Sequence, residues 1–127
     1  MGGKQLSVLV VDDSLLVRKQ LRGILEEQGC TVLEATNGSQ AFQTIETSQP
    51  DLILMDIVMP EQDGIEALRK IKEVKPGTKV VMVSSVGTQS YLKEAIKIGA
   101  YDFLQKPINA EAIHRLLTNL RKGECGA

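Results

Sequence analysis

The sequence predicts a doubly wound α/β fold, in which helices cover both faces of a parallel sheet. Five short runs rich in Val, Leu and Ile alternate with five amphipathic segments. Because parallel strands need crossover connections, this alternation favours βα units. The length of 127 residues suits one such domain. We expect the domain to cover residues 5–122, with flexible tails at 1–4 and 123–127.

The expected strands are short and almost wholly apolar, which is typical of strands covered on both faces. They lie at residues 6–11, 31–35, 51–56, 79–84 and 101–104. The third run, DLILMD, ends in a single acid, Asp56. A buried carboxylate without a partner is costly, so this acid either caps a turn or takes part in chemistry.

The first expected helix begins at Ser14, which can cap its N-terminus, and ends at Gly29. Apolar residues follow the cap at helical spacing. The helix also has a basic side, made of Arg18, Lys19 and Arg22. We interpret this basic side as a solvated face.

The other expected helices are also bounded by cap and turn residues. They run from Ser39 to about Gln49-Pro50, from the loop 57–63 to Pro76-Gly77, over 88–98, and from Asn109 to the end of the domain. Each has apolar residues on one side, as a helix that covers a sheet requires.

Composition excludes several classes of function. Lys plus Arg is 15 and Asp plus Glu is 16, so no excess of charge favours nucleic acid. An aromatic content of 3% disfavours base stacking. No apolar run reaches the length of about 18 residues that a membrane span needs. We therefore expect neither direct nucleic-acid binding nor membrane insertion. Cys30 and Cys125 lack metal-ligand spacing and are interpreted as reduced thiols, so we expect a cytoplasmic protein.

The polar exceptions to the apolar strands fall at one end of each strand. Asp12 and Asp13 follow the first strand, Asp56 ends the third and Ser84 ends the fourth. Lys106 follows the fifth strand. Because ligands of such sheets bind outside the carboxyl ends of the strands, these residues predict one site.

Three neighbouring carboxylates in a partly desolvated cleft raise one another's pKa unless cations are present. Oxygen ligands alone favour a hard ion, and a few carboxylates with waters suit Mg²⁺. A carboxylate can also attack phosphorus and form an acyl phosphate. Lys106 and Ser84 could then bind the phosphoryl oxygens.

Four segments together resemble the receiver domain of two-component response regulators, over nearly the whole chain. They are VVDDS (10–14), LILMDIVMPEQDG (52–64), VVMVSS (80–85) and GAYDFLQKP (99–107). The resemblance is to stand-alone receivers of the chemotaxis type. It implies a flavodoxin-like (βα)5 fold with a five-stranded parallel sheet in the order 2-1-3-4-5.

The resemblance also implies the roles of the acidic residues. Asp56 would be the phosphoacceptor. Asp13 and Asp56 would bind Mg²⁺ directly, and Asp12 would act through a bound water. The main-chain carbonyl of Val58 would complete the ligands that the protein supplies.

Three further positions match the family's switch. Ser84 would bond a phosphoryl oxygen and move toward it, and Lys106 would pair with the phosphoryl group. The peptide between Lys106 and Pro107 would be cis. Phe103 would be the aromatic residue that rotates inward, although a plain core role for it is an equal alternative.

The function implied is a phosphoaccepting signalling module, not an enzyme beyond its own phosphorylation and dephosphorylation. Its partners would be a histidine kinase or phosphotransfer protein and a downstream output protein. The signal would be a conformational change of the face formed by the fourth helix, fifth strand and fifth helix.

Four alternatives remain open from the sequence. The chain could be a receiver excised from a longer regulator. It could be a Mg²⁺-dependent aspartyl-phosphate phosphohydrolase, although Val58 stands where such enzymes have a second acid. A flavin or nucleotide site is disfavoured, since the acids after the first strand would repel phosphate. A pseudo-receiver is disfavoured by the full set of acids, hydroxyl and lysine.

Overall fold

The structure is a computed structural model that describes residues 5–57, 64–85 and 89–126. Five strands and five α-helices alternate along the described chain, which confirms the predicted fold class. The strands are β1 (Ser7–Val11), β2 (Thr31–Ala35), β3 (Leu52–Asp56), β4 (Lys79–Ser84) and β5 (Asp102–Gln105). The α-helices are α1 (Leu15–Glu27), α2 (Gly38–Ser48), α3 (Gly64–Val74), α4 (Leu92–Ile98) and α5 (Ala110–Gly126). None of these helices is long and apolar enough to cross a membrane.

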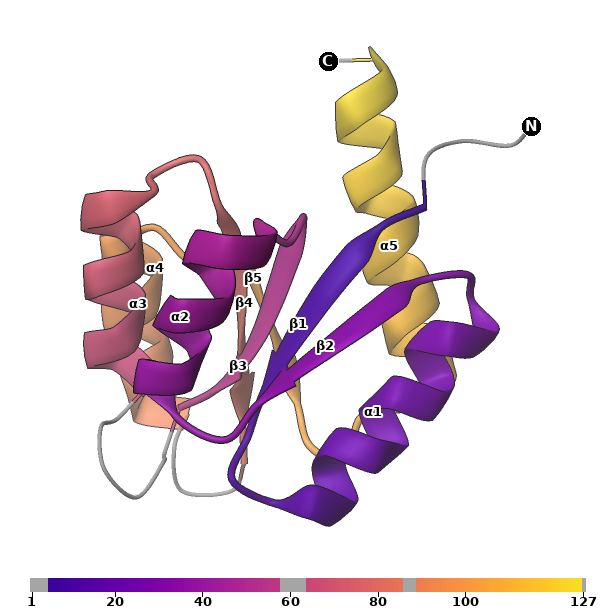
Figure 1. The fold of residues 1–127 in the computed structure, drawn as a ribbon, viewed down its shortest axis with the longest axis horizontal. Coiled ribbons are helices and arrows are strands. Elements are labelled where there is room, and N and C mark those ends of the chain that lie inside the picture. Colours follow the sequence, from indigo (N-terminus) through magenta and orange to yellow (C-terminus); the bar gives the residue numbers. More distant parts are fainter. Residues whose placement is uncertain (1–4, 58–63, 86–88, 127) are drawn as a thin grey trace.

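The strands form one parallel sheet in the order β2-β1-β3-β4-β5, as the resemblance implies (Figure 1). The chain therefore moves from β1 to one edge of the sheet and then back past β1 to the other. β3 lies at the centre, between β1 and β4. The register pairs Val11 with Met55 and Asp56 with Val83, so these strands end close together.

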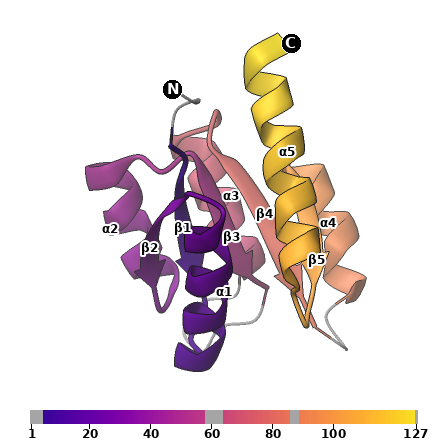
Figure 2. The ribbon, with the colours of Figure 1, turned by 90° about the vertical axis from the view of Figure 1, so that its right-hand side faces the viewer.

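Helices cover both faces of the sheet (Figures 1 and 2). Alternate residues of the three inner strands, β1, β3 and β4, enter separate cores, because successive side chains point to opposite faces. Val8 and Val10 of β1 pack in the core under α1 and α5. Leu9 and Val11 pack in the core under α2, α3 and α4. Burial on both faces explains why the strands lack an alternating polar pattern.

Cap residues define where the helices begin. The Ser14 hydroxyl accepts a hydrogen bond from the Val17 N–H, which confirms the predicted cap of α1. The helix α2 begins earlier than predicted, because Asn37 rather than Ser39 is its cap. Asparagine caps as well as serine, and the Asn37 side chain accepts from the Gln40 N–H at 2.9 Å.

Three boundaries differ from the sequence prediction at the C-terminal end. The fourth predicted helix is a short 3-10 helix (Gln89–Tyr91) followed by α4, and β5 lies one residue later than predicted. The helix α5 continues to Gly126, past residue 122 where the domain was expected to end. A single glycine costs a helix only about 1 kcal/mol, so Gly123 does not end it. The first four residues and Ala127 lie outside the described chain.

The start of α3 lies against the end of β3, and Gly64 makes this approach possible. A Cβ atom at Gly64 would clash with the Asp56 carbonyl oxygen and would lie 2.9 Å from the Ile57 Cα. The Gly64 N–H donates a hydrogen bond to the Ile57 carbonyl. Because both obstacles are backbone atoms, a side chain here would displace the main chain that holds Asp56.

We expect Gly64→Ala to lower the free energy of unfolding by about 2 to 3 kcal/mol, since the backbone must move to admit the methyl group. The matched control is Gly23→Ala in α1, where a Cβ would meet nothing within 4 Å. That change should stabilise the helix by about 0.5 to 1 kcal/mol. Urea unfolding of the two variants measures the difference, and equal stabilities would contradict the proposed close approach.

Candidate functional site

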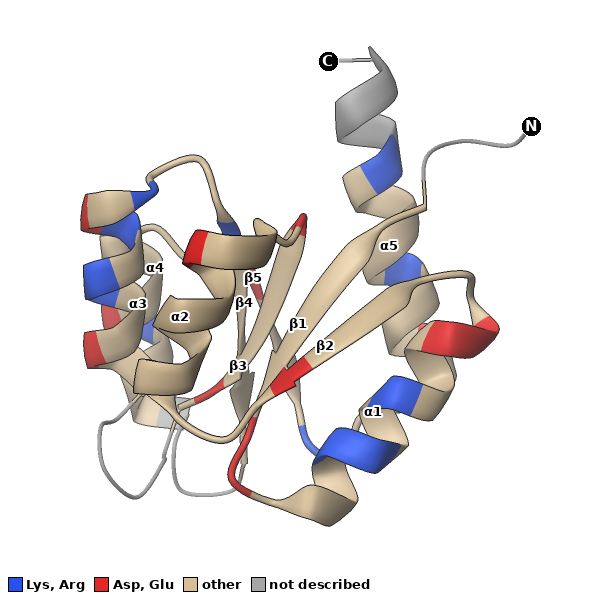
Figure 3. Cartoon of the chain, in the orientation of Figure 1, with Lys and Arg blue, Asp and Glu red and all other residues tan. Residues whose placement is uncertain are grey.

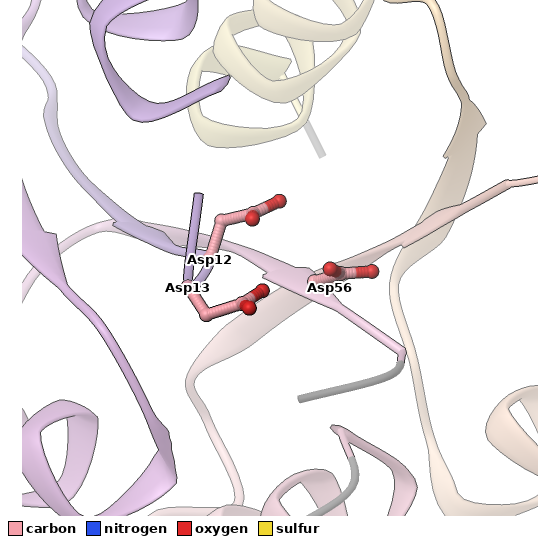
Figure 4. A group of neighbouring side chains, drawn as sticks. All are labelled: Asp12, Asp13 and Asp56. Atoms are coloured by element: carbon pink, nitrogen blue, oxygen red, sulfur yellow. The ribbon is translucent and has the colours of Figure 1, made fainter. Parts of the chain in front are cut away.

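The polar residues predicted from the strand ends meet at one edge of the sheet. Asp12 and Asp13 follow β1, Asp56 is the last residue of β3, and Lys106 follows β5. Figure 4 shows the three carboxylates turned toward a common space. The carboxyl ends of parallel strands meet at the same edge, which is why positions 44 residues apart in the sequence become neighbours.

The three carboxylates form a tight cluster. One oxygen from each of Asp12, Asp13 and Asp56 lies within 4.8 Å of the others. Asp12 and Asp56 are only 2% and 7% exposed, whereas Asp13 is exposed to solvent. Two of the three charges therefore lie where water screens them poorly, and they need cations nearby.

Lys106 is the cation that the chain itself supplies. Its Nζ lies 3.0 Å from Asp12 Oδ2 and 3.4 Å from Asp56 Oδ2, so it bridges the acids of β1 and β3. Burial opposes the charge on Lys106, but the two carboxylates outweigh burial and raise the pKa of Lys106 above its ordinary value. Lys106 therefore stays protonated, and it neutralises one of the three negative charges.

Asp12 is held through several of its polar atoms. Its N–H donates to the Ala35 carbonyl at 3.1 Å, at the end of the β1–β2 ladder. Its Oδ1 accepts from the Ser14 N–H at 2.9 Å, and its Oδ2 faces Lys106. These contacts fix both the backbone and the rotamer of Asp12.

The sequence did not predict one contact of Asp12, which is made by Arg18. Arg18 Nη1 donates to the Asp12 carbonyl at 2.8 Å, and Arg18 Nε pairs with Glu34 at 2.9 Å. The Arg18 side chain is only 11% exposed, so the interpretation of the basic side of α1 as a solvated face is wrong for this residue. The signal in the sequence was Glu34, a single acid inside the second apolar run.

Ser84 ends β4 and is 1% exposed. Its hydroxyl donates to the Leu104 carbonyl of β5 at 3.5 Å, a long and weak hydrogen bond. Phe103 lies on β5 and is 45% exposed, outside the carboxylate cluster. In this structure the aromatic ring is therefore not a core residue, which was the plain alternative to a switch role.

Two predicted features remain, the cis peptide after Lys106 and the Val58 carbonyl. The peptide between Lys106 and Pro107 is cis, as the resemblance implies. The Lys106 N–H donates to the Ser84 carbonyl at 2.8 Å, which ties the start of this loop to β4. Val58, whose carbonyl was predicted as a metal ligand, lies outside the described residues.

The chemistry of this donor set fits a hard divalent cation. Among the described residues the candidate ligands are the carboxylate oxygens of Asp12, Asp13 and Asp56, which suit Mg²⁺ or a similar ion better than a soft metal. The cluster also has more negative charge than Lys106 can neutralise. The cluster of Asp12, Asp13 and Asp56 is thus compatible with Mg²⁺ on both ligand type and charge.

A family model and several known proteins match this chain, and they agree on one family. The family model described as the response regulator receiver domain matches residues 8–118. A chemotaxis protein CheY from Bacillus subtilis is 42% identical over 107 residues, which cover 84% of this chain and 89% of that protein. A chemotaxis protein CheY from Thermotoga maritima is 39% identical over 116 residues, covering 91% of this chain and 97% of that protein.

A solved structure has the same fold. The CheY-like response regulator receiver domain protein from Methanospirillum hungatei superimposes with a TM-score of 0.88 at 26% sequence identity. The match covers 98% of this chain and 100% of that chain. The likeness therefore extends over the whole sheet and its helices, not only over the acidic cluster.

We expect Asp13→Asn to raise the free energy of unfolding by about 1 kcal/mol in metal-free, low-salt buffer, since it removes one of three clustered charges. The Asp13 carboxylate has no hydrogen-bond partner among the described residues, so the change breaks no contact there. Salt should shrink the gain. Urea unfolding with a chelator present measures it, beside Glu73→Gln at an exposed position of α3. A destabilised Asp13→Asn would contradict the electrostatic argument.

Proposed function

The chain belongs to the response regulator receiver family, and we propose that its Asp56 accepts a phosphoryl group from a histidine kinase or a phosphotransfer protein. The observation that carries this proposal is the position of Asp56 at the end of the central strand, between a lysine and two further acids. Of the three acids, Asp56 is the one that ends the central strand, where Lys106 faces it.

The cation site of the proposal consists of Asp12, Asp13 and Asp56 and takes Mg²⁺. When bound, Mg²⁺ supplies positive charge that offsets the negative charge of an incoming phosphoryl group. Asp13, which is exposed, is the carboxylate that an ion from solvent reaches first. Asp12 is already bonded to Ser14 and Lys106, which agrees with a role for it through water.

In the proposed transfer, an oxygen of the Asp56 carboxylate attacks phosphorus. A phosphorus–oxygen bond forms while the phosphorus–nitrogen bond of the donor phosphohistidine breaks, and its electron pair stays on the imidazole nitrogen. The product on this chain is an acyl phosphate. Lys106, which pairs with Asp56 Oδ2 at 3.4 Å, keeps its charge beside the phosphoryl oxygens.

Ser84 and Phe103 carry the proposed conformational signal. The Ser84 hydroxyl donates to Leu104 of β5 before transfer, and a phosphoryl oxygen competes for that donor afterwards. Movement of Ser84 toward the phosphoryl group vacates space beside β5. Phe103, now 45% exposed, then rotates inward.

The proposed output surface is the face of α4, β5 and α5. Large apolar side chains are exposed there at Ile96, Tyr101 and Phe103. A downstream output protein that binds this face would detect the position of Phe103. The relatives from Bacillus subtilis and Thermotoga maritima are named chemotaxis proteins, which supports the proposal of a chemotaxis-type pathway for this chain.

A groove beside Lys106 supports the docking of the phosphoryl donor on α1. Its volume is about 460 Å³, and it opens between α1 and the start of α5. Its apolar lining is Val17, Leu21, Pro107 and Ile108. Leu15 and Leu16, on the first turn of α1, are 56% and 67% exposed. An apolar helix of the donor would cover these side chains and bring its phosphohistidine to Asp56.

The direct test is incubation with acetyl phosphate and Mg²⁺, followed by intact mass spectrometry. We expect one added phosphoryl group on the parent, none on Asp56→Asn, and none on the parent when a chelator removes Mg²⁺. Asp102→Asn, at the other end of the strands, is the matched control and should be labelled like the parent. Equal labelling of Asp56→Asn would reject Asp56 as the acceptor, and steady turnover of a simple phosphate ester would favour the phosphohydrolase alternative.

Lys106→Met should separate cation binding from phosphoryl transfer. Because Lys106 competes with a cation for Asp12 and Asp56, its removal should raise the affinity for Mg²⁺ by about fivefold. Loss of the positive charge beside the phosphoryl group should nevertheless slow labelling by about tenfold or more. Calorimetric titration and a labelling time course measure the two effects, with Lys70→Met on the exposed side of α3 as control. Parallel losses of affinity and rate would contradict this separation.

A further inference from the structure

Arg18 connects the acidic cluster to a second strand of the sheet. Its Nη1 donates to the Asp12 carbonyl at 2.8 Å, and its Nε pairs with Glu34 Oε1 at 2.9 Å. The guanidinium therefore bonds to the end of β1 and to the middle of β2 at the same time. Figure 3 shows the basic positions of α1 and the acidic position of β2 on the two elements that this ion pair joins.

Glu34 is a fixed anchor for Arg18. Arg22 Nε donates to Glu34 Oε2 at 2.6 Å, and Arg22 Nη2 donates to the Val32 carbonyl at 3.3 Å. The hydrogen bond from Arg22 lowers the pKa of Glu34 below its ordinary value, although burial opposes this and the bond from Arg18 adds to it. Glu34 also lies opposite Val10 in the β1–β2 register, so its backbone is held by the ladder. Both oxygens of Glu34 are thus used, and the anchor is rigid.

The Asp12 carbonyl is the atom through which this anchor can act on the site. Asp12 lies between the last residue of β1 and the first residue of α1, so no backbone N–H of these two elements supplies the hydrogen bond to its carbonyl. Arg18 supplies it instead. The same carbonyl belongs to the peptide that joins Asp12 to Asp13, so fixing its direction fixes that peptide plane.

Asp13 depends on this peptide plane more than its neighbours do. Asp12 and Asp56 have side-chain partners, whereas the Asp13 carboxylate is exposed and has none among the described residues. Its backbone therefore fixes the direction of its Cα–Cβ bond, and no described side-chain contact can compensate if that direction changes. We propose that Arg18, anchored by Glu34, is a positioning residue that holds the Asp12–Asp13 peptide so that both carboxylates face one cation. This inference rests on the cation site of the proposed function.

The direction in which Mg²⁺ affinity changes when Arg18 is replaced distinguishes a positioning role from a purely electrostatic one. Removal of a positive charge near three acids should by Coulomb's law strengthen the binding of a cation. Loss of a group that orients metal ligands should weaken it, and such groups are worth roughly tenfold or more in affinity. We therefore expect Arg18→Met to raise the Mg²⁺ dissociation constant by about tenfold, measured by calorimetric titration of the full chain.

Two further readouts follow from a positioning role and not from a merely structural one. In metal-free protein, the backbone amides of Asp13 and Ser14 should exchange hydrogen faster in Arg18→Met than in the parent. With acetyl phosphate, the Mg²⁺ concentration for half-maximal labelling of Asp56 should rise, while the rate at saturating Mg²⁺ should return close to that of the parent.

The matched control is Arg69→Met, which makes the same substitution in another Arg–Glu pair. Arg69 pairs with Glu94 at 3.1 Å, both side chains are 52% exposed, and neither touches the acidic cluster. Its Mg²⁺ affinity should equal that of the parent. If Arg18→Met does not fold, Arg18→Lys replaces it, because it keeps the charge and loses the planar fork; it should also bind Mg²⁺ more weakly.

Each outcome decides the inference. An unchanged or tighter Mg²⁺ affinity in the folded Arg18 variant, or an equal loss in Arg69→Met, would overturn the positioning role and leave the proposed cation site intact. A parent that binds no Mg²⁺ would overturn the cation site and this inference together. Weaker binding in the Arg18 variant alone, with faster exchange at Asp13 and Ser14, would support it.

Discussion

Repulsion among the acids at the edge of the sheet is the constraint that the rest of the site must satisfy. Asp12, Asp13 and Asp56 each bring an oxygen within 4.8 Å of the others, and two of these side chains are nearly excluded from water. Charges so placed would separate or take up protons unless something held them and something neutralised them. The fold holds them, and Lys106 supplies part of the neutralisation. The charge that remains makes the site compatible with a cation.

The apolar strands are what resist this repulsion. β1 and β3 pair directly, and both are covered on two faces, so the ends that carry the acids cannot move apart without opening the core. Gly64 adds a close contact of α3 with the backbone of Asp56. On the other side, Arg18 ties Asp12 to Glu34 on β2. The hydrophobic core thus opposes the repulsion among the carboxylates, because it fixes them at distances that they would not adopt in a flexible loop.

The sequence alone was sufficient for the fold class and for the edge where the site lies. Apolar runs gave the strands, and the rule that ligands bind at the carboxyl ends placed Asp12, Asp56 and Lys106 together. The strand order came only through the resemblance, because hydrophobic patterns do not say which strands are neighbours. Arg18 was missed for a similar reason. Its partner Glu34 is on another element, and only the rotation of α1 against β2 decides that the arginine points inward.

Ser84 shows how such a rigid site can still transmit a change. Its hydroxyl has one proton to donate, and in this structure that proton goes to the Leu104 carbonyl through a bond of 3.5 Å. Under the proposed function, a phosphoryl oxygen offers a charged acceptor, and charge-assisted hydrogen bonds are the stronger kind. The hydroxyl therefore loses only a weak hydrogen bond when it moves away from β5. β5 is an edge strand whose one neighbour in the described sheet is β4, so its side chains can rearrange with little disturbance to the rest of the sheet. The weak hydrogen bond from Ser84 to β5 lies next to Phe103, which is exposed on the surface. Under the proposed function, phosphorylation of Asp56 would therefore change the surface at this strand.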